Sequence, residues 1–222
     1  HLCSDSHDAL QADSFAKFLR EQVMEKRHNQ EPWGSQEGAR DLTNGLAWFL
    51  SLPPTELPEN FAGRGTNVQT IQAHHFGARE EGWPIGNDVR WGPFQRWACG
   101  LGFAWKTSTG LTVPDPTPPL RDIIPEVFAN EDRLSATDFL KAIAKAVPVL
   151  DGGTYRKFVQ DNLEEGQSLG PQNQLSQALT DALRRLERSN EIQLEGRDDA
   201  VGRARHDANR RPFTHVSIGS EQ

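Results

Sequence analysis

The sequence contains almost no cysteine and no long apolar run. Only Cys3 and Cys99 carry thiols, too few for a disulfide framework or a four-ligand zinc site on their own. The longest apolar stretches, Leu46–Leu50 and Val147–Leu150, fall far short of the roughly 20 residues that a membrane-spanning helix needs. The N-terminal segment also lacks the charged start and apolar centre of a signal peptide. These absences favour a soluble protein of the reducing cytoplasm.

The sequence also lacks the motifs of common catalytic sites. It has no Gly-x-x-x-x-Gly-Lys-Ser/Thr loop, no strand-anchored Gly-x-Gly-x-x-Gly turn and no Gly-x-Ser-x-Gly elbow. His74 and His75 are adjacent, so on a helix their side chains point about 100° apart and rarely bind one ion. Paired carboxylates such as Glu80 and Glu81 fall in segments expected to be loops, which favours solvated turn charges. We therefore predict that the protein is not an enzyme and holds no cofactor or metal.

The charge is negative overall but unevenly distributed. The formal net charge is -7 at pH 7, which argues against a simple polyanion binder because nucleic-acid affinity depends on Lys and Arg neutralising phosphates. Between Arg184 and Arg211, however, eight arginines outnumber six acids, so this segment carries +2 and the rest of the chain -9. Such asymmetry can place a local basic face on an acidic body.

Apolar residues at three- and four-residue spacing predict helices and one hairpin before residue 114. The expected segments are helices over Asp8–Lys26, Ala39–Leu52, Asn67–Phe76 and Val89–Gly100, and a β-hairpin whose strands flank Ser108–Gly110. Asn87 or Asp88 is a favourable N-cap for the last of these helices. Pro93 is unfavourable inside a helix, which favours a start near Gly92.

A second set of elements is expected after a proline-rich stretch. Four prolines between Pro114 and Pro119 predict a stiff linker, and Ser135 with Asp138 resembles an N-capping sequence. The segments predicted beyond the linker are short helices over Leu120–Phe128 and from Ser135 to Pro148, a helix over Tyr155–Leu163 capped by Thr154, a long helix from Leu175 to about Arg188, and strands over Glu191–Glu195 and Phe213–Ile218. The roughly 17 polar residues between the strands are expected to form a long wing.

The stretches LSQALTDALRRLERSNEIQLE (175–195) and FTHVSI (213–218) resemble the last helix and wing of winged-helix domains. In that family the third helix commonly lies in the DNA major groove, and the wing touches the backbone or minor groove. The order helix, short helix, helix, hairpin extends the resemblance to residues 39–113. The architecture is also similar to small tandem winged-helix proteins of the DpdG type, which are found beside bacterial DNA-modification and phage-defence genes.

The resemblance implies a mainly α protein with small β-hairpins, of the α+β class. It divides the chain into an N-terminal helix and loop (1–34), a winged-helix-like unit (35–113), a proline-rich linker with a short helix (114–134) and a C-terminal winged helix (135–219).

The same resemblance implies a set of DNA-binding residues on three surfaces. They are Gln174, Ser176, Gln177, Thr180, Arg184 and Arg188 on the solvent face of the long helix, Arg203, Arg205, Arg210 and Arg211 on the wing, and Arg90, Arg96 and Lys106 in the first unit. Gln and Arg can make bidentate contacts to adenine and guanine edges, and Ser and Thr suit phosphate or either base. Acids interleaved with the arginines, such as Asp181 and Asp207, would repel phosphate.

Two functions from different classes are therefore left open. Clustered arginines favour a DNA-binding or DNA-targeting subunit of a bacterial DNA-modification or phage-defence assembly. The acidic net charge favours a protein-interaction adaptor in a larger complex, without direct DNA contact. Trp83, Trp91, Trp97 and Trp105 could stack on bases, but their helical and strand spacing is more typical of a core.

Overall fold

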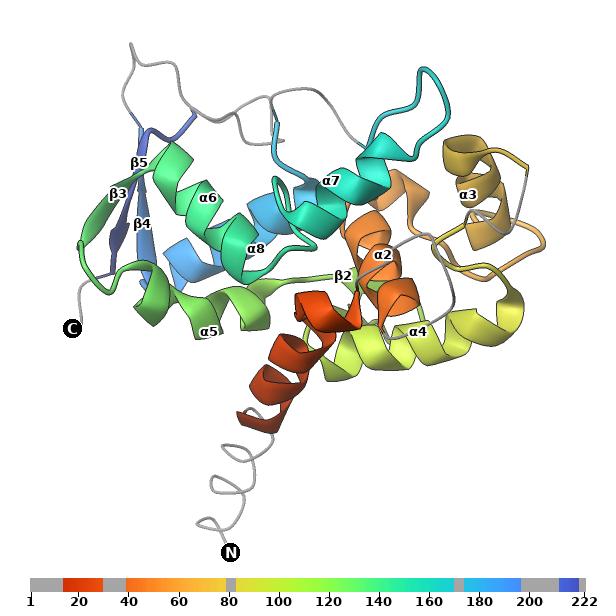
Figure 1. Ribbon diagram of the computed structural model, residues 1–222, viewed down its shortest axis with the longest axis horizontal. Helices are drawn as coiled ribbons and strands as arrows, with labels where there is room; N and C mark the ends of the chain where they lie inside the picture. Colours follow the sequence, from red (N-terminus) through yellow and green to blue (C-terminus); the bar gives the residue numbers. More distant parts are fainter. Residues whose placement is uncertain (1–13, 30–38, 79–82, 170–173, 197–211, 220–222) are drawn as a thin grey trace, which may run out of the picture.

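The computed structural model describes residues 14–29, 39–78, 83–169, 174–196 and 212–219 (Figure 1). Helices predominate within these ranges, and the strands form two small antiparallel sheets. The predicted α+β class with small β-hairpins is confirmed. None of the helices in these ranges is long and apolar enough to cross a membrane.

The N-terminal elements follow the segments predicted before residue 114. They are a helix over residues 14–24, η1 (Lys26–His28), α2 (Arg40–Phe49), η2 (Pro54–Glu56), α3 (Val68–Phe76), α4 (Asp88–Gly100), β1 (Ala104–Lys106) and β2 (Thr112–Pro114). Asn67 and Asn87 cap α3 and α4, because their side chains accept hydrogen bonds from backbone amides of the first turn. Strands β1 and β2 pair as the predicted hairpin.

The expected start of α4 near Gly92 is wrong, because the helix begins at Asp88 and carries Pro93 in its interior. Pro93 has no amide hydrogen, so the carbonyl of Val89 lacks its intrahelical donor. The Val89 side chain is 76% exposed, so this turn borders solvent, where the carbonyl can be hydrated. The Asn87 cap and burial of the Trp91 side chain offset the remaining cost.

The C-terminal elements also match the predicted order, with one addition. They are α5 (Thr117–Val127), β3 (Arg133–Ser135), α6 (Ala136–Ala146), α7 (Thr154–Asp161), α8 (Gln177–Arg188), β4 (Ile192–Glu195) and β5 (His215–Ile218). Ser135 caps α6 as predicted, accepting from the Asp138 amide. Asn190, which follows α8, adopts φ 58°, the left-handed conformation expected at a helix end. Strand β3 was not predicted, because three residues are too few to show an alternating pattern.

Two expectations about this half are corrected. The stretch from Pro114 to Pro119, predicted as a stiff linker, belongs largely to two elements: Pro114 ends β2, and Pro119 lies in the first turn of α5, where a missing amide hydrogen costs little. Thr154 is not the cap of α7 but its first residue, after Gly153. The Pro148 carbonyl instead accepts from the first-turn amides of α7, and a Cβ on Gly153 would lie 2.3 Å from that oxygen.

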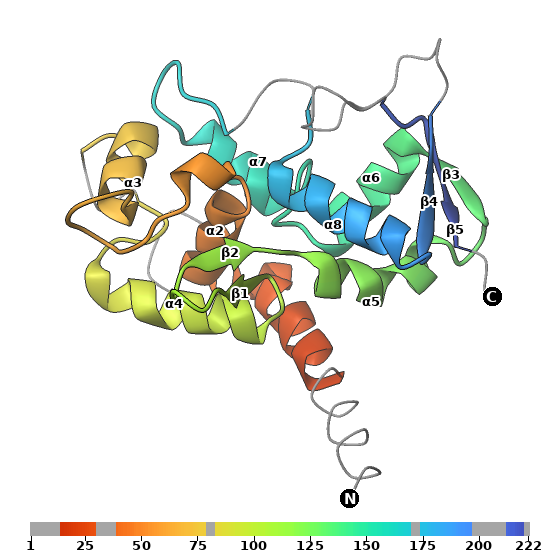
Figure 2. The same cartoon turned by 180° about the vertical axis from the view of Figure 1, so that it is seen from behind.

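The C-terminal sheet closes one end of the molecule, opposite the end that carries α3 (Figures 1 and 2). Its strand order is β3-β5-β4, all antiparallel. Val216 sits in the central strand between Leu134 and Leu194 and is fully buried. The strand before α6 is thereby joined to the hairpin that follows α8.

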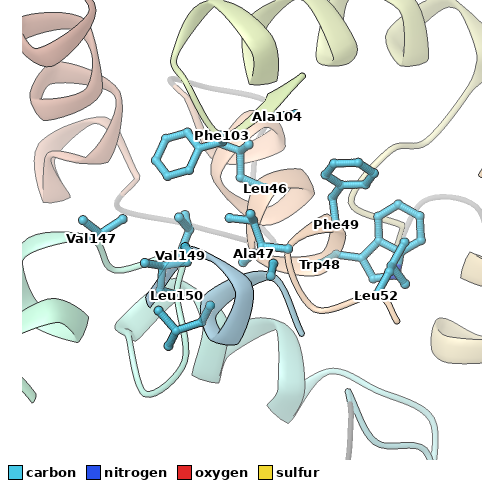
Figure 3. Close-up of a cluster of buried hydrophobic side chains, with 14 of the residues drawn as sticks. Leu46, Ala47, Trp48, Phe49, Leu52, Phe103, Ala104, Val147, Val149 and Leu150 are labelled. Atoms are coloured by element: carbon cyan, nitrogen blue, oxygen red, sulfur yellow. The ribbon is translucent and has the colours of Figure 1, made fainter. Parts of the chain in front are cut away.

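The core is one continuous cluster centred on α2. Leu46, Trp48 and Phe49 are fully buried, and each such side chain contributes roughly 1.5–3 kcal/mol through removal from water. Figure 3 shows α2 side chains between Phe103, from the start of the hairpin, and Val149, from the segment before α7. Residues from both predicted units therefore share this core, while the division of the chain into domains stays a prediction.

A buried arginine also links the two regions. Arg156 on α7 is 3% exposed and donates to the carbonyls of Ala47 at 2.7 Å and Leu169 at 3.0 Å. Burial lowers the pKa of Arg156, and the nearby negative charge of Asp151 raises it. The Tyr155 hydroxyl donates to the Met24 carbonyl at 2.9 Å, so α7 is bonded to α2 and to the N-terminal helix.

Candidate nucleic-acid interface

Helix α8, the predicted recognition helix, is fixed at its start by a double cap. Ser176 accepts from the Leu179 amide, and its own hydroxyl and amide donate to the Asp151 carboxylate at 2.6 and 3.0 Å. Leu179, Leu183 and Leu186 face the core, and α8 packs on α5 and β4. The helix is thus a rigid element, and half of its residues are buried. Figure 2 views the molecule from the side on which α8 is drawn in front of α7.

Two of the predicted contact residues on α8 lie inside the protein. Ser176 is 8% exposed and Thr180 is 1% exposed, so the expectation that both lie on a solvent face is wrong. Ser176 is used as the helix cap, and Thr180 is enclosed because α8 is covered on more sides than its leucine stripe. Their side chains cannot reach DNA without local rearrangement.

Two of the three arginines of α8 pair with acids. Asp181 accepts from Gln177 at 2.9 Å and pairs with Arg184 at 3.3 Å, while Arg185 pairs with Asp115 at 2.5 Å. Exposed ion pairs are weak, so a phosphate could displace such an acid, but part of its binding energy would be spent on doing so. The spacing of Asp181 and Arg184 on a helix predicts their ion pair, whereas no sequence pattern predicts that Arg185 pairs with Asp115.

The two ends of α8 are the predicted positions most open to solvent. Gln174, just before the helix, and Arg188, its last residue, are exposed. Near the second end, Arg121 and Glu191 form a bidentate pair with distances of 2.7 and 2.8 Å. The hydrogen bond from Arg121 holds the pKa of Glu191 below its usual value. Arg188 is therefore the predicted α8 arginine best placed for a phosphate.

The wing arginines Arg203, Arg205, Arg210 and Arg211 lie outside the described residues, so their expected DNA contacts stay a prediction. The described base of the wing is held by a cross-strand pair between Arg133 and Glu195 at 2.7 Å. This pair anchors β3 to the edge strand β4.

The three cations predicted to contact DNA in the first unit differ in ion pairing and in exposure. Arg90 pairs with Asp41 at 2.6 Å, whereas Arg96 on α4 and Lys106 on β1 are exposed. Gln95 donates to Thr112 at 2.8 Å, which fixes the hairpin against α4. Arg96 and Lys106 are thus carried by two elements that are bonded together.

The four clustered tryptophans divide evenly between core and surface. Trp83 and Trp91 are each 6% exposed, as expected for core residues, while Trp97 is 48% and Trp105 44% exposed. Exposed indoles are suited to stacking on bases or on apolar partner groups.

The adjacent histidines His74 and His75 differ in burial and in hydrogen bonding. Within the described residues no group of three or more His, Cys, Asp or Glu side chains could hold a metal ion. Trp48 donates to Nδ1 of His75 at 3.1 Å, a bond between two buried side chains, while His74 is exposed.

Comparison with known proteins agrees with one of the resemblances noted in the sequence. The family model described as DpdG-like matches residues 2–200. Searches of curated proteins and of solved structures gave no significant match. The family match extends over both halves of the folded protein and most of the sequence, and the chain therefore belongs to the DpdG-like family.

Proposed function

We propose that this protein is a DNA-binding or DNA-targeting subunit, not itself an enzyme, of a bacterial DNA-modification or phage-defence assembly. Membership of the DpdG-like family supports the setting. The observation that carries DNA contact is the C-terminal arrangement, in which α8 is followed directly by the β4–β5 hairpin and β3 completes the sheet. A helix followed by a wing is the arrangement that winged-helix proteins use on DNA.

The positions of the exposed cations indicate which surfaces contact DNA. Since α8 is largely covered, we propose that it does not enter the groove along its length but contributes its open ends, including Arg188. Arg96 and Lys106 supply a second patch on α4 and the hairpin, and the wing arginines supply a third. Phosphate contacts of this kind position a protein on DNA without reading sequence.

The first test is binding of the full chain to duplex DNA, measured by fluorescence anisotropy between about 50 and about 200 mM salt. We expect affinity that falls steeply with salt. Binding that ignores salt, or no binding at the low-salt end, would contradict the proposal.

Charge-reversal variants locate the contact. Arg188→Glu, and Arg96→Glu combined with Lys106→Glu, should each weaken binding and reduce the salt slope by about 1 per lost phosphate contact. Arg27→Glu is a matched control, because the Arg27 side chain is 59% exposed and pairs only locally with Glu25. If Arg27→Glu weakens binding as much as Arg188→Glu, the effect is one of net charge and the assigned surface is wrong.

A second function is favoured by an exposed apolar groove on the first unit. Val89 and Trp97 on α4 line it together with Leu42, Ile85 and Pro93, and its volume is about 460 Å³. Apolar grooves of this type receive partner side chains, which fits a protein-interaction adaptor. Co-purification from the native host of a protein that is lost with Val89→Ser and Trp97→Ser, while DNA binding is absent, would favour the adaptor.

A further inference from the structure

A cleft of about 350 Å³ lies where the two halves of the chain meet, at the start of α8 and away from Arg188, Arg96 and Lys106. Its walls come from the segment after α2, the end of α3, the segment after α7 and the start of α8. The size is within the range of about 300–1,000 Å³ typical of small-molecule sites. Figure 1 shows the segment after α7 beside α3 at this junction.

The cleft has a rigid back wall. Arg156 bonds the carbonyls of Ala47 and Leu169 from behind it, and Leu169 lines the cleft. The Glu164 amide donates to the His75 carbonyl at 2.8 Å, which joins the segment after α7 to α3. The shape of the cleft is thus set by buried bonds, and a ligand would find it formed in advance.

His75 presents one hydrogen-bond donor of fixed position. Its side chain is 6% exposed and lines the cleft. Because the Trp48 indole donates to Nδ1, that nitrogen is an acceptor, and the proton of the neutral ring is on Nε2. Burial lowers the pKa of His75 to about 4, so the ring is neutral at pH 7. Among the described residues, Nε2 has no hydrogen-bond partner.

The remaining lining determines the charge and shape of a suitable ligand. No Lys or Arg is among the described residues of the wall, and Glu56 places a carboxylate at the cleft, so phosphates and carboxylates are disfavoured. Gln167, Gln174 and Gln177 add amide groups that both donate and accept. Leu52 and Leu175 add apolar surface.

We propose that this cleft binds an uncharged planar heterocycle of the nucleobase or nucleoside class. An acceptor atom of the ligand ring takes a hydrogen bond from Nε2–H of His75, and the edge of the base forms hydrogen bonds with the glutamine amides. Such a ligand matches the mixture of donors, acceptors and apolar surface without requiring a cation. The proposal does not depend on DNA binding by the rest of the protein.

The test uses the full chain with histidine ¹⁵N labels and titrations of adenosine, guanosine, cytidine and uridine, followed by NMR and calorimetry. We expect at least one nucleoside to saturate and to shift His75 Nε2, while ribose and inorganic phosphate do not. No saturable binding by any nucleoside, or an equal response to ribose or phosphate, would overturn the proposal.

Two variants distinguish the loss of a ligand contact from the loss of the folded structure. His75→Asn keeps an acceptor for the Trp48 indole but removes the Nε2 donor, and should lower affinity about tenfold, as expected for one neutral hydrogen bond. Ser168→Trp changes an exposed residue of the wall and should block the cleft without touching the core. His28→Asn, on η1, is the control and should bind as wild type. Unchanged affinity in Ser168→Trp would overturn the proposal even if His75→Asn does not fold.

Discussion

Burial of the His75 imidazole makes the stability of the protein depend on pH. Burial, followed by the positive charges of His74 and Arg156, lowers the pKa of His75 from 6.5 to about 4 in the folded protein. Between these pH values the unfolded chain takes up a proton that the folded chain does not, so the free energy of unfolding falls as pH falls through this window. The contribution is on the order of 3 kcal/mol by pH 4.

His75→Asn should remove this component, because Asn does not titrate and still offers an oxygen to Trp48. Urea unfolding of the variant and of wild type between pH 4 and pH 7 measures the difference, since all other titrating groups are common to both. Parallel pH profiles for the two proteins would show that His75 is not the source of this pH dependence.

Arg156 is a buried charge that stabilises the fold by donating hydrogen bonds to two backbone carbonyls. Arg156→Leu leaves the oxygens of Ala47 and Leu169 without these donors, at a cost of about 1–3 kcal/mol for each buried group. We therefore expect a loss of roughly 2–5 kcal/mol in urea unfolding. Lys157→Ala is the adjacent control: its exposed pair with Asp161 is worth less than about 1 kcal/mol, and equal losses in the two variants would contradict this account.

At the scale of elements, replacing glycine with alanine should have opposite effects on stability at two positions. Gly100 is the last residue of α4, and an added Cβ would meet no atom within 4 Å beyond its chain neighbours and the helix backbone, so Gly100→Ala should stabilise by about 0.5–1 kcal/mol. At Gly153 the Cβ would lie 2.3 Å from the Pro148 carbonyl oxygen, so Gly153→Ala should destabilise. Thermal melting of both variants checks the pair, and a stabilised Gly153→Ala would show that the segment before α7 can move.

Elements were predictable where local chemistry determines them. The Ser135 and Asn87 caps and the leucine stripe of α8 are local signals, and both caps and the α8 helix are found where these signals place them. Pro93 within α4 is tolerated where Trp91 packs on Phe49 of α2, a contact between distant segments that local patterns do not contain. The cap of α7 is a backbone carbonyl, that of Pro148, and no residue type signals such an acceptor. For the site, the sequence identified the arginines of α8 but not the burial of Thr180, because that burial depends on which elements pack on α8.

At the scale of the whole molecule, the shared core predicts a single cooperative unfolding transition. All six tryptophans precede residue 114, so indole fluorescence reports on the first half alone, whereas far-UV circular dichroism reports on every helix. We expect the two signals to give the same urea midpoint. Separate midpoints would indicate that the halves unfold independently and that the bonds made by Arg156 do not couple them.

The bond from Arg156 to Ala47 also has a consequence for biosynthesis. The partners are separated by 109 positions in the chain, and N-terminal segments leave the ribosome first. Until α7 has emerged, the nascent chain carries α2 without the helix that packs on it and bonds the Ala47 carbonyl. We therefore expect that chaperones which bind exposed apolar segments can reach this face of α2 during synthesis but not in the folded protein.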